Sequence, residues 1–296
     1  MYFNIRYSGS VISANENRSY IGWVSRTGFK LNNMNVVTSK DGTTIAYDQM
    51  GEGPAIILVD GALCTRSTGS KPELIKLLAY HFTVYSYDRR GRGDSGDTKP
   101  YSVGREIDDI ESLINKAGGV ACLYGHSSGA ALALEAAAKL GKKVIKLAMY
   151  EVPYNNDLQA RQSWRDYLKQ LTDLLEANRR GDAVALFMRS VGMPAEQVEA
   201  MTHAPIWSKF EAVAPTLAYD HAAILGEDAS VPTDLAASVN LPALVMTGGS
   251  SFAFMHDTAQ TLSDAMSHAE LRILEGQTHE VSPEALAPIL VEFFTR

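Results

Sequence analysis

The chain has 296 residues, of which 46% are hydrophobic and 21% charged, a composition typical of a globular protein and unlike that of a disordered or fibrous one. Lys and Arg total 27 against 34 Asp and Glu, giving a net charge of −7 without a basic stripe, so we expect no nucleic-acid partner. No apolar run reaches the roughly 20 residues that span a bilayer, and the first 20 residues lack the apolar block of a signal peptide. We therefore expect a cytoplasmic protein with no membrane partner, and the oligomeric state stays open.

Residues 1–33 are polar and show neither strand nor helix periodicity, so we expect an N-terminal arm there. The segment NVVTS, which begins at Asn35, is joined to TTIAYDQ by a turn that contains Asp41 and Gly42. An Asp-Gly pair tolerates positive φ, and these two segments therefore predict an antiparallel hairpin. The continuous apolar run AIILV at 55–59 predicts a strand that helices cover on both faces.

Strands and helices then alternate along the chain. Further strands are predicted at 82–87, 120–124, 144–150, 243–247 and 270–274. Helices are predicted near 71–80, 102–117, 128–140, 256–268 and 282–295. This alternation predicts a mostly parallel α/β sheet flanked by helices, whose ligands lie beyond the carboxyl ends of the strands.

Residues 154–238 interrupt the alternation, because their pattern is helical and contains no strand. A helical insertion between two strands of one sheet is best interpreted as a lid over the strand ends. We therefore expect a core formed by 34–153 and 239–296, with 154–238 as the lid.

The clearest chemical motif is Gly125-His126-Ser127-Ser128-Gly129, which stands between the predicted strand VACLY and the helical run AALALEAAAKL. A serine on so sharp a strand-to-helix turn has a strained backbone, and small residues two positions away on either side let neighbouring backbone approach. The start of the helix offers free N–H groups to a developing anion. The motif in this context predicts that Ser127 is a nucleophile.

With this motif, the chain from about residue 35 to 296 resembles the α/β-hydrolase fold family. ILVDGALCTRS at 57–67 is similar to the family's turn after the third strand, YDRRGRGDSG at 87–96 to its loop after the fourth, and LEGQTHEVSP at 274–283 to its catalytic histidine segment. The resemblance implies an eight-stranded, mostly parallel sheet flanked by helices, with a helical cap inserted after the sixth strand.

The resemblance also implies roles for individual residues. His279 looks like the catalytic base, and the backbone N–H groups of Ala62 and Ser128 correspond to the oxyanion hole. Asp60 stands where the family often has histidine, which affects the local hydrogen bonding.

The acid of the catalytic triad has alternatives. In most of the family it follows the strand after the cap, where this chain has Ser250 and Ser251. Glu151 follows the strand VIKLAMY and resembles the arrangement in haloalkane dehalogenases, which place a catalytic Glu after that earlier strand. Asp257 is a second candidate, although its expected position in the first turn of a helix gives it a role in stabilising the helix terminus. A site without a conventional acid is the third.

Other features have simpler interpretations. The other histidines outside the serine motif are expected to be solvated, namely His81, His203, His221, His256 and His268. The charged residues Arg89, Arg90, Asp94 and Asp97 are expected to form a salt-bridged loop rather than a binding site.

Cofactor motifs are weak. Gly91, Gly93 and Gly96 have the spacing of a dinucleotide fingerprint, but residues 97–101 separate them from the next helix. No metal-ligand spacing is present either. We expect no cofactor and no metal.

These observations predict a serine hydrolase that cleaves a carboxylic ester, thioester or lactone of a small, fairly apolar substrate through an acyl-enzyme on Ser127. Its partner is then a small molecule. One alternative is a catalytically silent α/β-hydrolase-like protein that binds a small molecule. Another is a non-hydrolytic relative such as a perhydrolase, lyase or acyltransferase.

Overall fold

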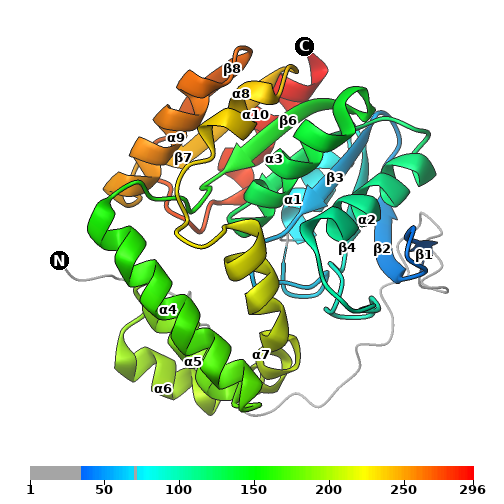
Figure 1. Ribbon diagram of the computed structural model, residues 1–296. Helices are drawn as coiled ribbons and strands as arrows, with labels where there is room; N and C mark the ends of the chain where they lie inside the picture. Colours follow the sequence, from blue (N-terminus) through cyan, green and yellow to red (C-terminus); the bar gives the residue numbers. More distant parts are fainter. Residues whose placement is uncertain (1–34, 70–71) are drawn as a thin grey trace, which may run out of the picture. The chain divides into compact units, whose positions relative to one another are not determined.

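The computed structural model describes residues 35–69 and 72–296, so the expected N-terminal arm at 1–33 lies outside the described residues. Within them, one eight-stranded sheet has the order β1-β2-β4-β3-β5-β6-β7-β8 (Figure 1). The pairs β1–β2 and β2–β4 are antiparallel, and the other pairs are parallel. The strands are β1 (Asn35–Thr38), β2 (Thr44–Met50), β3 (Ala55–Val59), β4 (Thr83–Tyr87), β5 (Ala121–His126), β6 (Val144–Tyr150), β7 (Ala243–Gly248) and β8 (Ala269–Leu274).

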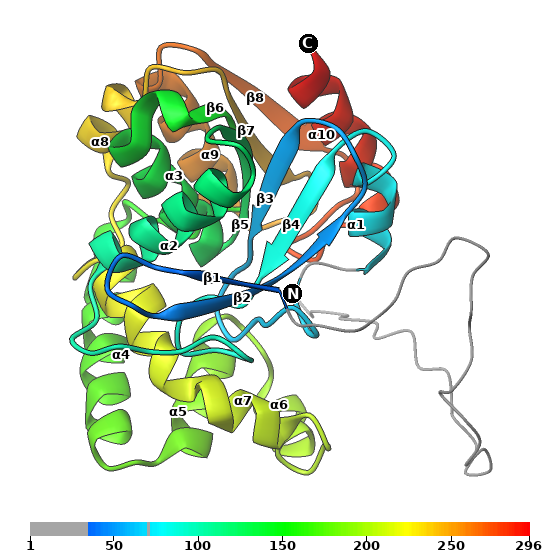
Figure 2. The same ribbon diagram turned by 90° about the vertical axis from the view of Figure 1, so that its right-hand side faces the viewer.

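Helices cover both faces of this sheet, as the sequence predicted. Helices α2, α3, α8 and α9 lie on one face, and α1 and α10 lie on the other (Figure 2). Their bounds are α1 (Pro72–Leu78), α2 (Val103–Lys116), α3 (Ser128–Leu140), α8 (Thr233–Ser238), α9 (Ala253–Ala265) and α10 (Pro283–Thr295), and a short 3-10 helix, η1 (Gly141–Lys143), follows α3.

Strand β3 shows why its sequence is a continuous apolar run. It pairs with β4 on one side and β5 on the other, and all five of its residues are buried. Successive side chains of a strand point to opposite faces. Ile57 and Val59 therefore enter the core beneath α2 and α3, whereas Ile56 and Leu58 enter the core beneath α1 and α10.

Residues 154–238, which we call the cap segment, connect β6 to β7 through helices and contain no strand in this fully described stretch. A hydrophobic cluster of their own includes Tyr167, Leu171 and Trp207, together with Leu63 from the loop after β3. The cap segment ends in α8, and before it come α4 (Leu158–Glu176), α5 (Arg180–Ser190), α6 (Ala195–Thr202), α7 (Trp207–Val213), the 3-10 helix η2 (Ala214–Thr216) and the π-helix η3 (Tyr219–Ile224).

The position of α9 differs from its predicted range of 256–268. The N–H of Ser251 donates to the carbonyl of Gly248, so the turn after β7 is complete by Ser251 and the helix begins at Ala253. Met266 is extended and leads into β8. Within the described part of the chain, no helix combines the length and apolar character needed to cross a membrane.

Candidate active site

Strained backbone marks the carboxyl ends of three neighbouring strands. Five of the described residues other than glycine have positive φ. Three of these follow adjacent parallel strands: Leu63 after β3, Ser127 after β5 and Glu151 after β6. Left-handed backbone is costly for residues with a side chain and concentrates at functional sites. Three of the five residues with strained backbone therefore lie at the edge of the sheet where ligands bind in parallel α/β folds.

The turn at Ser127 is a sharp strand-to-helix junction. Ser127 has φ 57° and ψ −130°, directly between the last residue of β5 and the first residue of α3. A Cβ on Gly129 would lie 2.1 Å from the carbonyl oxygen of Val59, and one on Gly125 would lie 2.5 Å from the Cα of Ala130. Both positions therefore require glycine for the close approach of backbone that forms the turn.

The Ser127 side chain lies next to the loop after β3. The backbone N–H of Ser127 donates to the carbonyl of Tyr150 over 3.0 Å, which connects the turn to the end of β6. A Cβ on Gly61 would lie 3.0 Å from Ser127 Cβ and 3.5 Å from Ser127 Oγ. The half-buried hydroxyl of Ser127 thus faces the loop that carries Ala62.

Glu151 is a buried carboxylate with several hydrogen-bond donors. Its Oε1 accepts from Thr247 Oγ1 over 2.7 Å and from the N–H of Gly248 over 2.8 Å, and its Oε2 accepts from Ser251 Oγ over 2.6 Å. Burial alone would raise the pKa of Glu151, but the hydrogen bonds from His279 and from these donors lower it to about 2. The carboxylate is therefore ionised throughout the neutral range.

His279 lies beyond β8 and contacts Glu151. Its Nδ1 is 3.3 Å from Glu151 Oε2, so a proton on Nδ1 points to the carboxylate and Nε2 is left as an acceptor. His126 Nε2 donates to the carbonyl of His279 over 3.0 Å, and the centroids of the two rings are 4.8 Å apart. Because His126 is the chain neighbour of Ser127, these contacts hold the imidazole beside the serine turn. Tyr150 Oη supports the same loop by donating to the carbonyl of Thr278 over 2.5 Å.

Two sequence expectations about the competing residues are wrong. Asp257 is the fifth residue of α9, because the helix begins earlier than predicted, and so it lies outside the first turn; its side chain is exposed. His221 is buried rather than solvated, and its Nδ1 is 2.7 Å from Tyr167 Oη. Removal from water lowers the pKa of His221 to about 4, so this ring is neutral at pH 7.

The two residues expected to form an oxyanion hole lie in different elements and have different hydrogen-bonded neighbours. Ala62 follows β3, where Arg92 Nη1 donates to the preceding carbonyl, that of Gly61, over 2.6 Å. Ser128 is the first residue of α3, a position whose N–H has no partner within the helix itself. Its side-chain Oγ donates to Asp220 Oδ1 over 2.8 Å.

The arginines after β4 are buried and paired, as the interpretation of a salt-bridged loop predicted. Arg89 Nη2 is 2.7 Å from Glu106, Arg90 Nη2 is 2.7 Å from Asp109, and Arg92 Nη2 is 2.5 Å from Asp220. Asp220 was not predicted, because it comes from a helical stretch of the cap segment with no recognisable motif.

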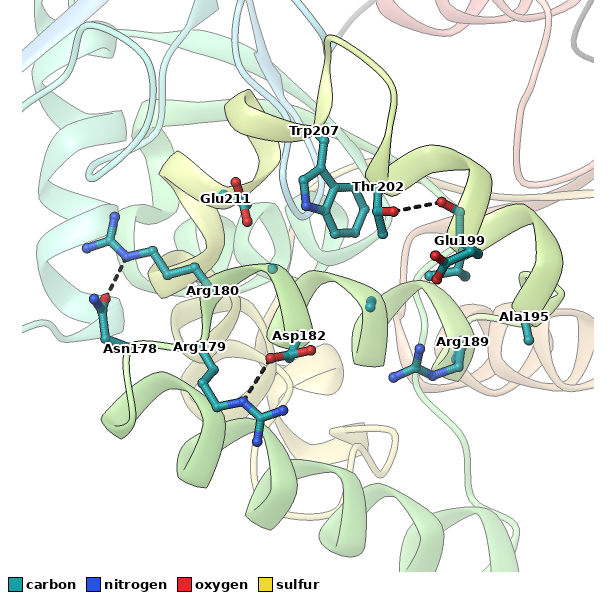
Figure 3. Close-up of a pocket in the computed structure, with 13 residues that line it drawn as sticks. Asn178, Arg179, Arg180, Asp182, Arg189, Ala195, Glu199, Thr202, Trp207 and Glu211 are labelled. Atoms are coloured by element: carbon teal, nitrogen blue, oxygen red, sulfur yellow. Dashed lines mark hydrogen bonds and ion pairs between the residues drawn. The ribbon is translucent and has the colours of Figure 1, made fainter.

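A cavity of about 490 Å³ lies elsewhere, between α5, α6 and α7, and all its lining residues fall within 178–211 (Figure 3). Its charged lining is balanced. Asp182 accepts from Arg179 over 2.8 Å, and Asn178 accepts from Arg180 over 3.0 Å. This cavity is separate in sequence from the strand ends described above, and we assign no chemistry to it.

Comparison with known proteins identifies the family. Residues 64–289, more than half of the chain, match the sequence model of the alpha/beta hydrolase family. The chain also resembles the solved structure of an alpha/beta hydrolase from Sphaerobacter thermophilus, with 48% identity and a TM-score of 0.79 over 88% of this chain and 100% of that one. This protein therefore belongs to the alpha/beta hydrolase family, which confirms the expected α/β-hydrolase fold, with its eight-stranded, mostly parallel sheet flanked by helices, and the expected hydrolase class.

More distant structures share the fold. A thermophilic esterase from Thermogutta terrifontis is 20% identical, with a TM-score of 0.66 over 89% of this chain and 98% of that one. An enol-lactonase from Burkholderia xenovorans is also 20% identical, with a TM-score of 0.61 over 88% of this chain and 100% of that one. At this identity the likeness extends to the fold alone.

Proposed function

We propose that this hydrolase cleaves a carboxylic ester, thioester or lactone of a small, fairly apolar substrate through an acyl-enzyme on Ser127. The observation that carries the proposal is the contact of His279 Nδ1 with the buried Glu151 carboxylate, at 3.3 Å, beside the strained turn of Ser127. This is the order of groups that activates a serine: a nucleophile, a base and an acid that orients the base.

In the first half of the reaction, Ser127 Oγ attacks the carbonyl carbon of the substrate while His279 Nε2 accepts the hydroxyl proton. The bond from that carbon to the leaving oxygen or sulfur then breaks, and His279 returns the proton to the departing alcohol or thiol. Glu151 stabilises the positive charge that the imidazole carries between these steps, which its low pKa allows at every pH where the imidazole acts as a base.

In the second half, His279 removes a proton from water, and the resulting hydroxide attacks the acyl carbon. The ester bond to Ser127 Oγ breaks, Ser127 recovers the proton from His279, and the free acid leaves. In both halves the carbonyl oxygen becomes an anion, which the N–H groups of Ala62 and Ser128 stabilise; a single donor of this kind is worth roughly 3 kcal/mol.

The cap segment supports the choice of an apolar substrate. Leu63 belongs to the hydrophobic cluster of the cap segment, and Ala62 packs against that cluster. The apolar side chains of Ala62 and Leu63 beside Ser127 support an apolar acyl group at this position. We propose that residues 154–238 act as the cap that covers this group and excludes water from it.

An acyl-chain series of aryl esters, together with simple lactones, tests this proposal. We expect turnover with release of the free acid, and we expect Ser127→Ala and Glu151→Gln each to lower kcat by about 10⁴. Asp257→Asn is the matched control and leaves kcat unchanged, because this side chain is exposed on α9. A loss in Asp257→Asn with full activity in Glu151→Gln would contradict the acid assignment. Acyl transfer without free acid would instead indicate a non-hydrolytic relative.

A further inference from the structure

The two peptide groups proposed as oxyanion donors, the N–H groups of Ala62 and Ser128, come from distant parts of the chain. Ala62 lies in the loop after β3 and Ser128 at the start of α3. One buried group of charged side chains contacts both the β3 loop and the start of α3. It consists of Arg89 and Arg92 from the loop after β4 and Asp220 from the π-helix η3 of the cap segment.

On the side of the β3 loop, the arginines hold carbonyl groups. Arg92 Nη1 donates to the carbonyl of Gly61 over 2.6 Å, and Arg89 Nη1 donates to the carbonyl of Asp60 over 3.2 Å. The carbonyl of Gly61 and the N–H of Ala62 belong to the same planar trans peptide, so they point in opposite directions. A bond that fixes the direction of the carbonyl therefore fixes the direction of the Ala62 N–H.

On the side of the serine turn, the carboxylate holds a side chain. Asp220 Oδ1 accepts from Ser128 Oγ over 2.8 Å and from Arg89 Nη1 over 2.6 Å, and Asp220 Oδ2 accepts from Arg92 Nη2 over 2.5 Å. This one carboxylate therefore connects the first residue of α3 to the guanidinium that orients the Ala62 peptide.

The environment of Asp220 makes this connection rigid. The side chain of Asp220 is fully buried, and those of Arg89 and Arg92 are almost completely buried. Burial would raise the pKa of Asp220, but the two guanidinium groups hold it at about 2, so the carboxylate stays charged. The two positive charges of the arginines are balanced by Asp220 and Glu106. Loss of one partner would leave a buried charge uncompensated, which is strongly unfavourable.

We propose that Asp220 is a positioning residue, which acts through Arg92 and Ser128 to hold both donors of the oxyanion hole in their working directions. The inference rests on the proposed function, because it concerns the anion formed on the substrate of Ser127. It also makes the geometry of the hole depend on the cap segment, since η3 supplies the carboxylate. A π-helix is rare, and such helices occur frequently at functional sites.

If Asp220 had only a structural role, its loss would lower stability without changing kcat. The chain offers a matched control for this outcome. Arg90 and Asp109 form an equally buried pair, with bonds of 2.8 and 2.7 Å. The other partners of Arg90 are Asp41 and the carbonyl of Arg105. Asp109→Asn therefore weakens a buried ion pair of the same loop, away from the peptides of Ala62 and Ser128.

The experiment compares Asp220→Asn, Ser128→Ala and Asp109→Asn in the full-length enzyme. It measures kcat and KM on an aryl ester, and the inhibition constant of a trifluoromethyl ketone, whose adduct with serine carries an oxyanion. We expect Asp220→Asn to lower kcat by about 10² and to raise the inhibition constant by a similar factor, with KM nearly unchanged, because the lost interaction acts on the transition state. Ser128→Ala, which keeps its N–H, should change both quantities in the same direction by roughly threefold to tenfold.

In Asp109→Asn we expect a lower melting temperature with kcat and the inhibition constant unchanged. If Asp220→Asn keeps the kcat of the natural enzyme, or changes only stability as Asp109→Asn does, the positioning role is overturned while the serine mechanism stands. If Asp220→Asn does not fold, Ser128→Ala decides, and an unchanged kcat there overturns the role. A natural enzyme that neither hydrolyses the ester nor forms the ketone adduct overturns the proposed function, and the positioning role with it.

Discussion

Glu151 illustrates at the residue scale how a carboxylate is kept charged inside the protein. Four donors surround it: Thr247, the N–H of Gly248, Ser251 and His279. Its left-handed backbone, with φ 54°, places the side chain under the end of β7 rather than along the path of β6. Ser251 occupies the region where most relatives were expected to carry the acid. In this structure that serine donates to Glu151 instead.

The first consequence is a pH dependence of stability. The pKa of Glu151 falls from an ordinary value of 4.5 to about 2 on folding. Its contribution is therefore complete above pH 4.5 and is lost as the pH falls toward 2, because the unfolded chain binds the proton more tightly. Between pH 6 and pH 3 we expect the free energy of unfolding to fall by about 2 kcal/mol more in the natural protein than in Glu151→Gln.

Urea denaturation at a series of pH values measures this difference. Asp257→Asn is the control and should follow the curve of the natural protein, because its side chain is exposed. Parallel curves for the natural protein and Glu151→Gln would contradict the ionised, hydrogen-bonded state of Glu151.

At the scale of elements, the site depends on the junction of β5 with α3. Gly129 is the second residue of α3, and a Cβ there would lie 2.1 Å from the carbonyl oxygen of Val59 and 2.5 Å from that of Asp60. Both obstacles are backbone atoms of β3 and its loop, which cannot move aside as a side chain could. The packing of helix against strand therefore sets the height of Ser127 above the sheet.

We expect Gly129→Ala to destabilise the protein by about 1–3 kcal/mol or more, and to reduce ester hydrolysis beyond what the loss of folded protein explains, because β3 and α3 must separate. Gly104→Ala is the matched control. Gly104 is also the second residue of a helix, α2, where the nearest atom to a new Cβ is Ser102 Oγ at 3.8 Å. That change should be neutral or stabilising by roughly 0.5–1 kcal/mol. Thermal unfolding and kcat of both variants test the prediction, and a Gly129→Ala protein as stable and active as Gly104→Ala would contradict it.

The elements were predictable because each has a local signal. The five-residue run of β3 and the Asp-Gly hairpin appear where the sequence placed them. The start of α9 was missed by three residues, because a turn closed by the Ser251 N–H has no periodicity of its own. His221 was missed because its burial depends on Tyr167, Trp164 and Phe187 of the cap segment, which only the tertiary structure brings together.

At the scale of the whole molecule, the strand order assembles the site. Parallel strands β5, β6, β7 and β8 are neighbours, so the segments that follow them, with Ser127, Glu151, Ser251 and His279, end at one edge of the sheet. Sequence order alone suggested this for Ser127 and His279. It left the acid open among Glu151, Asp257 and a site without a conventional acid, because the choice depends on which side chain reaches the end of β7. The pairing of Asp220 with Arg89 and Arg92 had no sequence signal, because Asp220 lies more than 120 residues from either arginine.

The proposed mechanism depends first on Ser127 as the nucleophile. Treatment of the natural protein with a fluorophosphonate, followed by peptide mass spectrometry, tests this role, because the reagent phosphonylates an activated serine hydroxyl much faster than an ordinary one. We predict one adduct per chain, located on Ser127, and its complete loss in Ser127→Ala. An unmodified protein, or an adduct that persists in Ser127→Ala, would show that Ser127 is not the nucleophile.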